Sequence, residues 1–121
     1  LDPIFARHSR HREAAHAAMK AIGLPLFAAE GHGSPAITAV APSGIDAEKL
    51  RKAVKDRYDI LLAGGQDHLK GKVFRIGHLG FVCDRDVLTA VAAIESVLQS
   101  LGLHKGSMGS GLSAASEILS Q

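Results

Sequence analysis

The segment that most limits the possible folds is DRDVLTAVAAIESVLQSLG, residues 84–102. Its apolar residues recur every three or four positions, which is the period of an α-helix with one buried stripe. The segment predicts a helix with Asp84 as its N-cap and Gly102 as its end. A helix with a single apolar stripe needs an apolar surface to cover, and 121 residues can supply one within a single domain. The predicted stripe contains Val87, Leu88, Val91, Ile94, Leu98 and Leu101.

A second helix is predicted near the start of the chain. Asp2 can cap it, Pro3 suits its first turn, and Gly23 followed by Pro25 ends it. The many small residues of this segment predict close packing against another surface. Its narrow apolar stripe contains Ala15, Ala18, Met19 and Ile22.

A third helix is predicted over residues 46–58, and a short tail helix over residues 112–121 that docks or frays. Asp46 is the expected cap of the third helix, and Ile45 and Leu50 have the spacing of a hydrophobic staple. The buried stripe is predicted to contain Leu50, Ala53, Val54 and Tyr58, with Lys49, Arg51, Lys52 and Lys55 facing water.

Short apolar segments at residues 36–41, 59–63 and 72–78 favour β-strands. The passage from Ala36 to Ala63 allows a parallel βαβ crossover, whereas the step from Leu62 to Val73 favours an antiparallel pair. The predicted order is α, β, α, β, β, α, α. We therefore predict one α+β domain over residues 1–121, with a small three- to four-stranded mixed or antiparallel sheet and helices packed on one face.

Composition narrows the classes of partner. Tryptophan is absent, aromatic residues make up 4% and the net charge is +2, which argues against nucleic acid and anionic membranes as partners. The single cysteine, Cys83, fits a reducing compartment, and neither a membrane-length apolar run nor a secretory signal is visible. We expect a cytoplasmic protein. Because the chain starts at Leu1 and not at methionine, we also expect it to be processed or a piece of a larger protein.

One arginine interrupts the strand-like run KGKVFRIGHLGFV, residues 70–82. Side chains alternate along a strand, so Phe74, Ile76 and His78 should share the core face, while Arg75 should point away with Val73 and Gly77. Two interpretations stay open. Arg75 is either an edge-strand charge that prevents aggregation, or a guanidinium that binds a carboxylate or phosphate.

The seven histidines do not predict a metal site. His8 and His11 lie near one another on the first helix, but His16 falls on another sector, and no acidic or cysteine ligand completes a known pattern. We expect a solvated polar face there, a structural role for His78 and a loop position for His32. Cys83 precedes a helix, where a thiolate is favoured, but the sequence places no base beside it.

The run AGGQDHLKGKVFRIGHLGFV, together with the helix at residues 84–102, resembles the C-terminal small domain of class V aminotransferases. These are the alanine–glyoxylate and serine–glyoxylate aminotransferases of pyridoxal-phosphate fold type I. The resemblance covers residues 5–103, and its most specific part is the pattern Arg75-x-Gly77-x-x-Gly80. The same run is similar to cyanobacterial proteins labelled as the small subunit of a soluble hydrogenase, although nothing in the sequence supports hydrogenase chemistry.

The resemblance implies that Arg75 binds the α-carboxylate of the substrate, and that Gly64 and Gly65 lie near the mouth of the active site. It also implies that a large N-terminal domain, absent from this chain, carries the lysine and the polar groups that hold pyridoxal phosphate. The complete enzyme is expected to be a homodimer. No catalytic, cofactor-binding or metal-binding residue is assigned to this chain, because its lysines fall on helix surfaces or in turns: Lys20, Lys49, Lys52, Lys55, Lys70, Lys72 and Lys105.

The predicted function is therefore that of one domain of an aminotransferase. The complete enzyme would transfer an amino group from alanine or serine to glyoxylate or a similar 2-oxo acid, and this chain alone is expected to be inactive. One alternative is a free-standing regulatory module that binds amino acids or dimerises through the sheet face without helices. Another is a stable proteolytic piece without an activity of its own.

Overall fold

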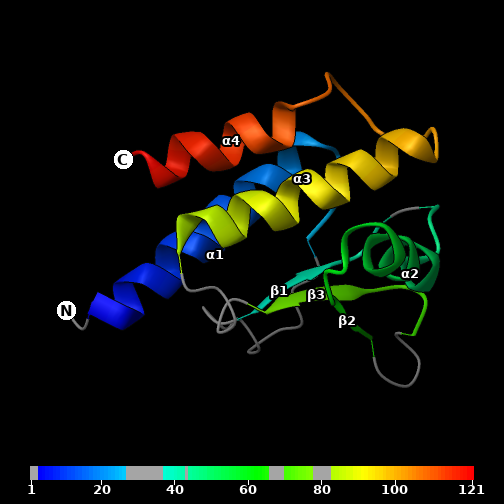
Figure 1. The fold of residues 1–121 in the computed structure, drawn as a ribbon, viewed down its shortest axis with the longest axis horizontal. Helices are drawn as coiled ribbons and strands as arrows, with labels where there is room; N and C mark the ends of the chain where they lie inside the picture. Colours follow the sequence, from blue (N-terminus) through cyan, green and yellow to red (C-terminus); the bar gives the residue numbers. More distant parts are fainter. Residues whose placement is uncertain (1–2, 27–36, 43, 66–69, 78–82) are drawn as a thin grey trace.

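The structure is a computed structural model that describes residues 3–26, 37–42, 44–65, 70–77 and 83–121. Within these residues the elements follow the predicted order of helices and strands (Figure 1). They are α1 (Pro3–Ala21), β1 (Ile37–Val40), α2 (Ala47–Tyr58), β2 (Ala63–Gly64), β3 (Phe74–Gly77), α3 (Asp84–Ser100) and α4 (Ser110–Leu119).

The three strands form a sheet in the order β1-β3-β2, and both neighbouring pairs are antiparallel. The predicted antiparallel step between the last two strands is confirmed. The β1–α2–β2 passage brings back a strand parallel to β1, which agrees with the predicted parallel crossover, and β3 lies between the two strands. This arrangement is a split βαβ unit. It places β3, and with it Arg75, in the middle of the sheet.

Strand β2 is shorter than predicted and begins four residues later. Asp59 adopts a left-handed conformation with φ of 56°, and its backbone N–H closes α2 on the carbonyl of Lys55. Residues 59–62 connect the end of α2 to the sheet and form no strand.

The helices cover one face of the sheet, as predicted. In Figure 1, α1 and α3 run side by side above the sheet, and α4 packs against them in the opposite direction. Helix α2 packs on α3, β2 and β3. The sheet and the helices share one hydrophobic core. Its largest fully buried apolar side chains are Phe74, Met19, Ile22, Leu50, Ile76, Ile94, Leu98, Val40 and Val54.

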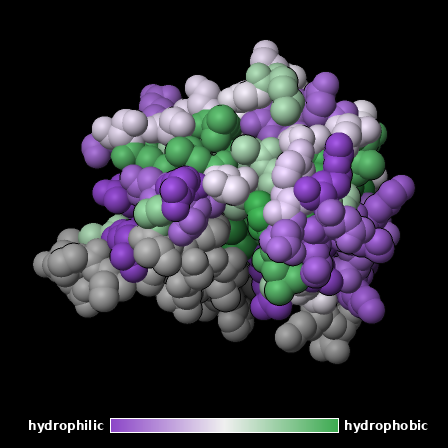
Figure 2. Space-filling view, in the orientation of Figure 1, coloured by the Kyte–Doolittle hydropathy of each residue, from purple (hydrophilic) through white to green (hydrophobic). Residues whose placement is uncertain are grey.

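Helix α2 begins as its sequence predicts. The Asp46 side chain accepts a hydrogen bond from the backbone N–H of Glu48 at 2.9 Å, and Leu50 and Val54 are fully buried. Tyr58 is 41% exposed and so lies outside the predicted stripe. Hydrophilic side chains gather over α2 on the right of Figure 2, which agrees with the exposure of Lys49, Lys52 and Lys55.

The start of α3 differs from the prediction, whereas Gly102, with φ of 72°, follows the C-cap and ends the helix as predicted. Cys83 is the N-cap, and its backbone N–H donates to the carboxylate of Asp86 at 3.3 Å. Asp84 is the first helical residue and does not cap the helix. Leu101 follows the last helical residue and is 36% exposed, so it does not join the buried stripe.

The tail helix is docked by a buried carboxylate that the sequence did not single out. Glu95 on α3 is 1% exposed and accepts hydrogen bonds from His104 Nε2 at 2.7 Å and from the backbone N–H groups of Gly109 at 2.7 Å and Leu112 at 3.2 Å. Burial raises the pKa of Glu95, but these bonds and one from the N–H of Gly111 outweigh it and hold the pKa below its usual range. Glu95 therefore anchors the N-terminus of α4 to α3.

Candidate substrate-binding site

Arg75 lies on the middle strand of the sheet, with its side chain on the face opposite the helix-packed core. Its neighbours along β3, Phe74 and Ile76, are 0% and 2% exposed, whereas Arg75 is half-buried. The predicted alternation is thus confirmed for these three residues. Val73 precedes the strand and is buried. Because β3 has a partner on both sides, the interpretation of Arg75 as an edge-strand charge is wrong.

The strand residues beside Arg75 have small side chains. The register places Ala39 of β1 and Ala63 of β2 directly opposite Arg75, one on each side. Directly paired residues share a face of a sheet, so the guanidinium stands between two methyl groups. Small neighbours on both sides leave room for a ligand to approach the arginine.

A hydrogen bond from Nε holds the guanidinium of Arg75 in place. Nε donates to the carbonyl oxygen of Gly64 at 3.1 Å. Among the described residues, no carboxylate forms an ion pair with Arg75. A half-buried guanidinium without a protein carboxylate is suited to receive one from a ligand.

Arg51 is a second half-buried arginine near the site, and the prediction that it faces water is wrong. Its Nε and Nη2 donate to the two carboxylate oxygens of Glu48, each at 2.9 Å, and its Nη1 donates to the carbonyl oxygen of Leu62 at 2.6 Å. This bidentate pair links α2 to the residue that precedes β2. The three-residue spacing of Glu48 and Arg51 was the available sequence signal for it.

All seven lysines of the chain lie in exposed positions, as the sequence predicted. Lys52, for example, forms a surface ion pair with Asp56 at 2.7 Å, and this bond raises the pKa of the lysine. A lysine that carries a cofactor needs a lowered pKa and a shielded setting, so these side chains do not fit that role.

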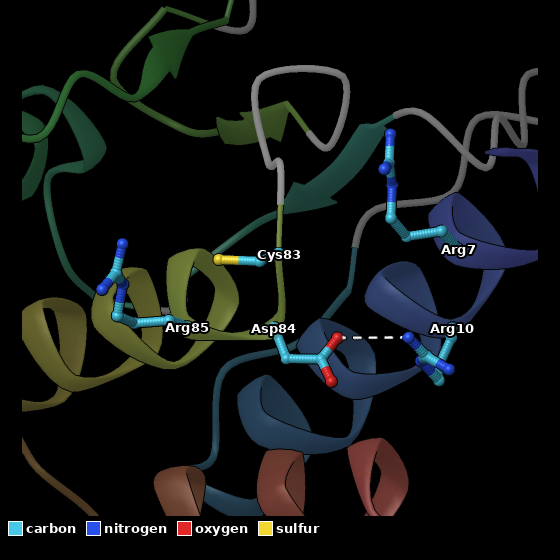
Figure 3. Close-up of a pocket in the computed structure, with 5 residues that line it drawn as sticks. All are labelled: Arg7, Arg10, Cys83, Asp84 and Arg85. Carbon is cyan, nitrogen blue, oxygen red and sulfur yellow. Dashed lines mark hydrogen bonds and ion pairs between the residues drawn. The ribbon is translucent and has the colours of Figure 1, made fainter.

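A hollow of about 580 Å³ lies where α1 meets the start of α3, lined by Arg7, Arg10, Cys83, Asp84 and Arg85 (Figure 3). Arg10 Nη2 lies 3.3 Å from Asp84 Oδ1, and both side chains are more than two-fifths exposed. In Figure 3, Arg7 and Arg85 lie on opposite sides of the view. The hollow therefore lacks a common point on which its cations converge.

His11 has a structural role that the sequence interpretation missed. It is completely buried, and its Nε2 lies 3.0 Å from Asp84 Oδ1, so it joins α1 to α3 and does not belong to a solvated face. Among the described residues, no group of three or more His, Cys, Asp or Glu side chains could hold a metal ion. His32, His78 and Gly80 lie outside the described residues.

No family model matches the chain, but known proteins and structures do. L-aspartate–glyoxylate aminotransferase of Paracoccus denitrificans is 39% identical over 119 residues, which cover 97% of this chain and 30% of that protein. The crystal structure of ureidoglycine–glyoxylate aminotransferase from Bacillus subtilis superposes with a TM-score of 0.86 at 34% identity, over 97% of this chain and 30% of that one. The chain is homologous to the class V aminotransferases. It matches their C-terminal portion and spans about 30% of their length.

Two cyanobacterial relatives carry a different name. The soluble hydrogenase small subunit of Synechococcus sp. (strain PCC 6716) is 60% identical over 120 residues, which cover 99% of this chain and 31% of that protein. The soluble hydrogenase 42 kDa subunit of Anabaena cylindrica is 55% identical over the same length.

In the part of the chain that the structure describes, no helix has the length and hydropathy to cross a membrane.

Proposed function

We propose that this chain is the C-terminal domain of a pyridoxal-phosphate-dependent aminotransferase, and that Arg75 binds the carboxylate of its substrates. The observation that carries this proposal is the placement of Arg75. It stands half-buried on the middle strand between two alanines, on the face away from the helices, and without a described carboxylate partner.

The substrates we propose are small amino acids and 2-oxo acids. Three relatives carry names that pair glyoxylate with aspartate, serine or ureidoglycine as the other substrate. We propose glyoxylate or a similar 2-oxo acid as the acceptor, with alanine or serine as the donor. Each of these molecules carries one carboxylate beside the reacting carbon, so a single fixed guanidinium can orient both substrates.

The role of Arg75 is to bind and orient the substrate. A guanidinium can donate two parallel hydrogen bonds to a carboxylate, which fixes both the position and the rotation of the substrate. The reacting carbon is then held in one place relative to the rest of the active site. When bound, pyridoxal phosphate supplies the electron sink for amino transfer. The lysine that holds it would come from a large domain outside this chain, and we propose a homodimer for the complete enzyme.

Substitution of Arg75 in the full-length protein tests this function. Arg75→Lys keeps the charge but loses the planar fork, and Arg75→Met loses both. We expect the KM for the amino donor to rise about tenfold in the first variant and about 100-fold in the second, because hydrogen bonds to charged groups contribute about 1.5–3 kcal/mol each. Arg57→Lys is a matched control, since Arg57 binds the Ser100 hydroxyl on the helical side of the domain. An unchanged KM in Arg75→Met would contradict the role.

A further inference from the structure

We infer that Arg51, with Glu48 and Gly64, positions Arg75 by holding strand β2 in place. The inference rests on the proposed carboxylate-binding role of Arg75 and names the residues that support it. None of the three needs to touch substrate, so they are positioning residues.

The first link joins helix α2 to the start of β2. Arg51 and Glu48 form a bidentate pair, and each side chain is 29% exposed. The hydrogen bond from Arg51 lowers the pKa of Glu48, and the same bond raises the pKa of Arg51, so both groups are charged at neutral pH. The remaining Nη1 of Arg51 donates to the Leu62 carbonyl, one residue before β2.

The second link is the close approach of this pair to Gly64. A Cβ atom added at Gly64 would lie 2.8 Å from Glu48 Oε2 and 3.1 Å from Arg51 Cζ. Gly64 is absent from the glycines with positive φ, so an L-residue could adopt its backbone conformation. A side chain at this position would therefore displace the ends of the Glu48 and Arg51 side chains.

The third link runs from Gly64 to the substrate-binding arginine. The Gly64 carbonyl accepts the hydrogen bond from Arg75 Nε. Strand β2 is only two residues long, and a bond from Gly65 N–H to the Val73 carbonyl at 3.0 Å extends its pairing with the β3 side. So short a ladder fixes the strand poorly by itself. The contacts from α2 therefore decide where the Gly64 carbonyl lies, and with it the guanidinium.

A purely structural ion pair would behave differently. An (i, i+3) pair on a helix adds a few tenths of a kcal/mol to stability and leaves substrate binding unchanged. A positioning pair changes the KM, because a displacement of about 1 Å in a bound group can cost on the order of 100-fold.

The first experiment compares Arg51→Met and Gly64→Ala in the full-length enzyme. We expect the KM for the amino donor to rise about tenfold in both, with a smaller change in kcat, and Arg51→Lys to recover part of the loss. The control is Lys52→Met, which removes an exposed ion pair with Asp56 on the same helix. If Arg51→Met and Lys52→Met have the same KM, the inference is overturned.

A double-mutant cycle tests whether Arg51 acts through Arg75. In the Arg75→Met background there is no guanidinium to position, so adding Arg51→Met should raise the KM no further. If the effects of the two substitutions multiply instead, Arg51 acts by another route and the inference is wrong.

A direct measurement separates this inference from the proposed function. In full-length protein with isotope-labelled arginine side chains, the Arg75 Nε–H signal is identified by its loss in Arg75→Met. We expect its exchange with water to accelerate several-fold in Arg51→Met and Gly64→Ala, and to stay unchanged in Lys52→Met. An unaltered rate in Arg51→Met overturns the positioning. If the rate changes but Arg75→Met keeps a normal KM, the proposed function fails while the positioning of the side chain stands.

Discussion

Two charged side chains of this domain, Glu95 and Arg75, differ in their burial and in the number of partners that the fold provides for their charge. Between α3 and α4, Glu95 is fully buried and accepts hydrogen bonds from His104 and from backbone N–H groups of α4. On the open face of the sheet, Arg75 is half-buried and has no described ion-pair partner. A charge that the fold satisfies contributes to stability, whereas a charge that the fold leaves open is available to a ligand.

The strongest test of this contrast removes the buried carboxylate. Glu95→Ala leaves His104 and backbone N–H groups at the N-terminus of α4 without their acceptor in a buried setting. We expect the free energy of unfolding to fall by about 3 kcal/mol, measured by urea denaturation of the 121-residue chain. Glu117→Ala is the matched control, because Glu117 is exposed on α4. Equal losses in both variants would contradict the anchoring role of Glu95.

A second test adds a methyl group at the contact between α3 and α4 and removes no charged group. A Cβ atom at Gly111 would lie 2.8 Å from Ile22 Cγ2 and 3.0 Å from Glu95 Oε1. We expect Gly111→Ala to cost about 1–2 kcal/mol through overpacking, even though alanine favours a helix. Ser113→Ala, at an exposed position of α4, should be neutral or slightly stabilising in the same urea assay. A stabilised Gly111→Ala variant would show that α4 is loosely packed.

The third test uses pH. The folded-state pKa of Glu95 lies below the usual value for a glutamate, so the stability that its carboxylate contributes is complete above that usual value and is lost as the pH falls through the folded-state pKa. We expect the protection of α4 amides against hydrogen exchange, measured relative to their intrinsic exchange rates, to decrease as the pH falls through the folded-state pKa of Glu95. Glu95→Gln cannot take up this proton and should have a flatter profile over the same range. Identical profiles would mean that other carboxylates cause the acid sensitivity.

The sequence predicted more of the fold than of the contacts within it. Regular periods and caps were enough for the order of elements, for the core face of β3 and for the direction of Arg75. The strand order was not accessible, because a split βαβ unit and a direct parallel pair can have the same local pattern. For this reason the edge-strand interpretation of Arg75 stayed open until the structure placed β3 in the middle.

Long-range polar partners were the other gap. Glu95 looks like an ordinary surface residue of an amphipathic helix until α4 is docked on it, and His11 looks solvated until Asp84 is brought beside it. Both side chains are buried by elements more than ten residues away in the chain. Local periodicity reports how a residue faces its own helix, and it carries no information on which other element covers that face.

The smallest expected effect on the free energy of unfolding is that of substituting Arg75. Because Arg75 donates one hydrogen bond to Gly64 and has no described ion-pair partner, Arg75→Met should change the free energy of unfolding of the 121-residue chain by only about 0.5 kcal/mol. The apolar stem of methionine can still cover Ala39 and Ala63, which keeps the packing on that face. If urea denaturation instead shows a loss as large as that of Glu95→Ala, Arg75 is a structural residue, and the division between satisfied and open charges would not hold in this domain.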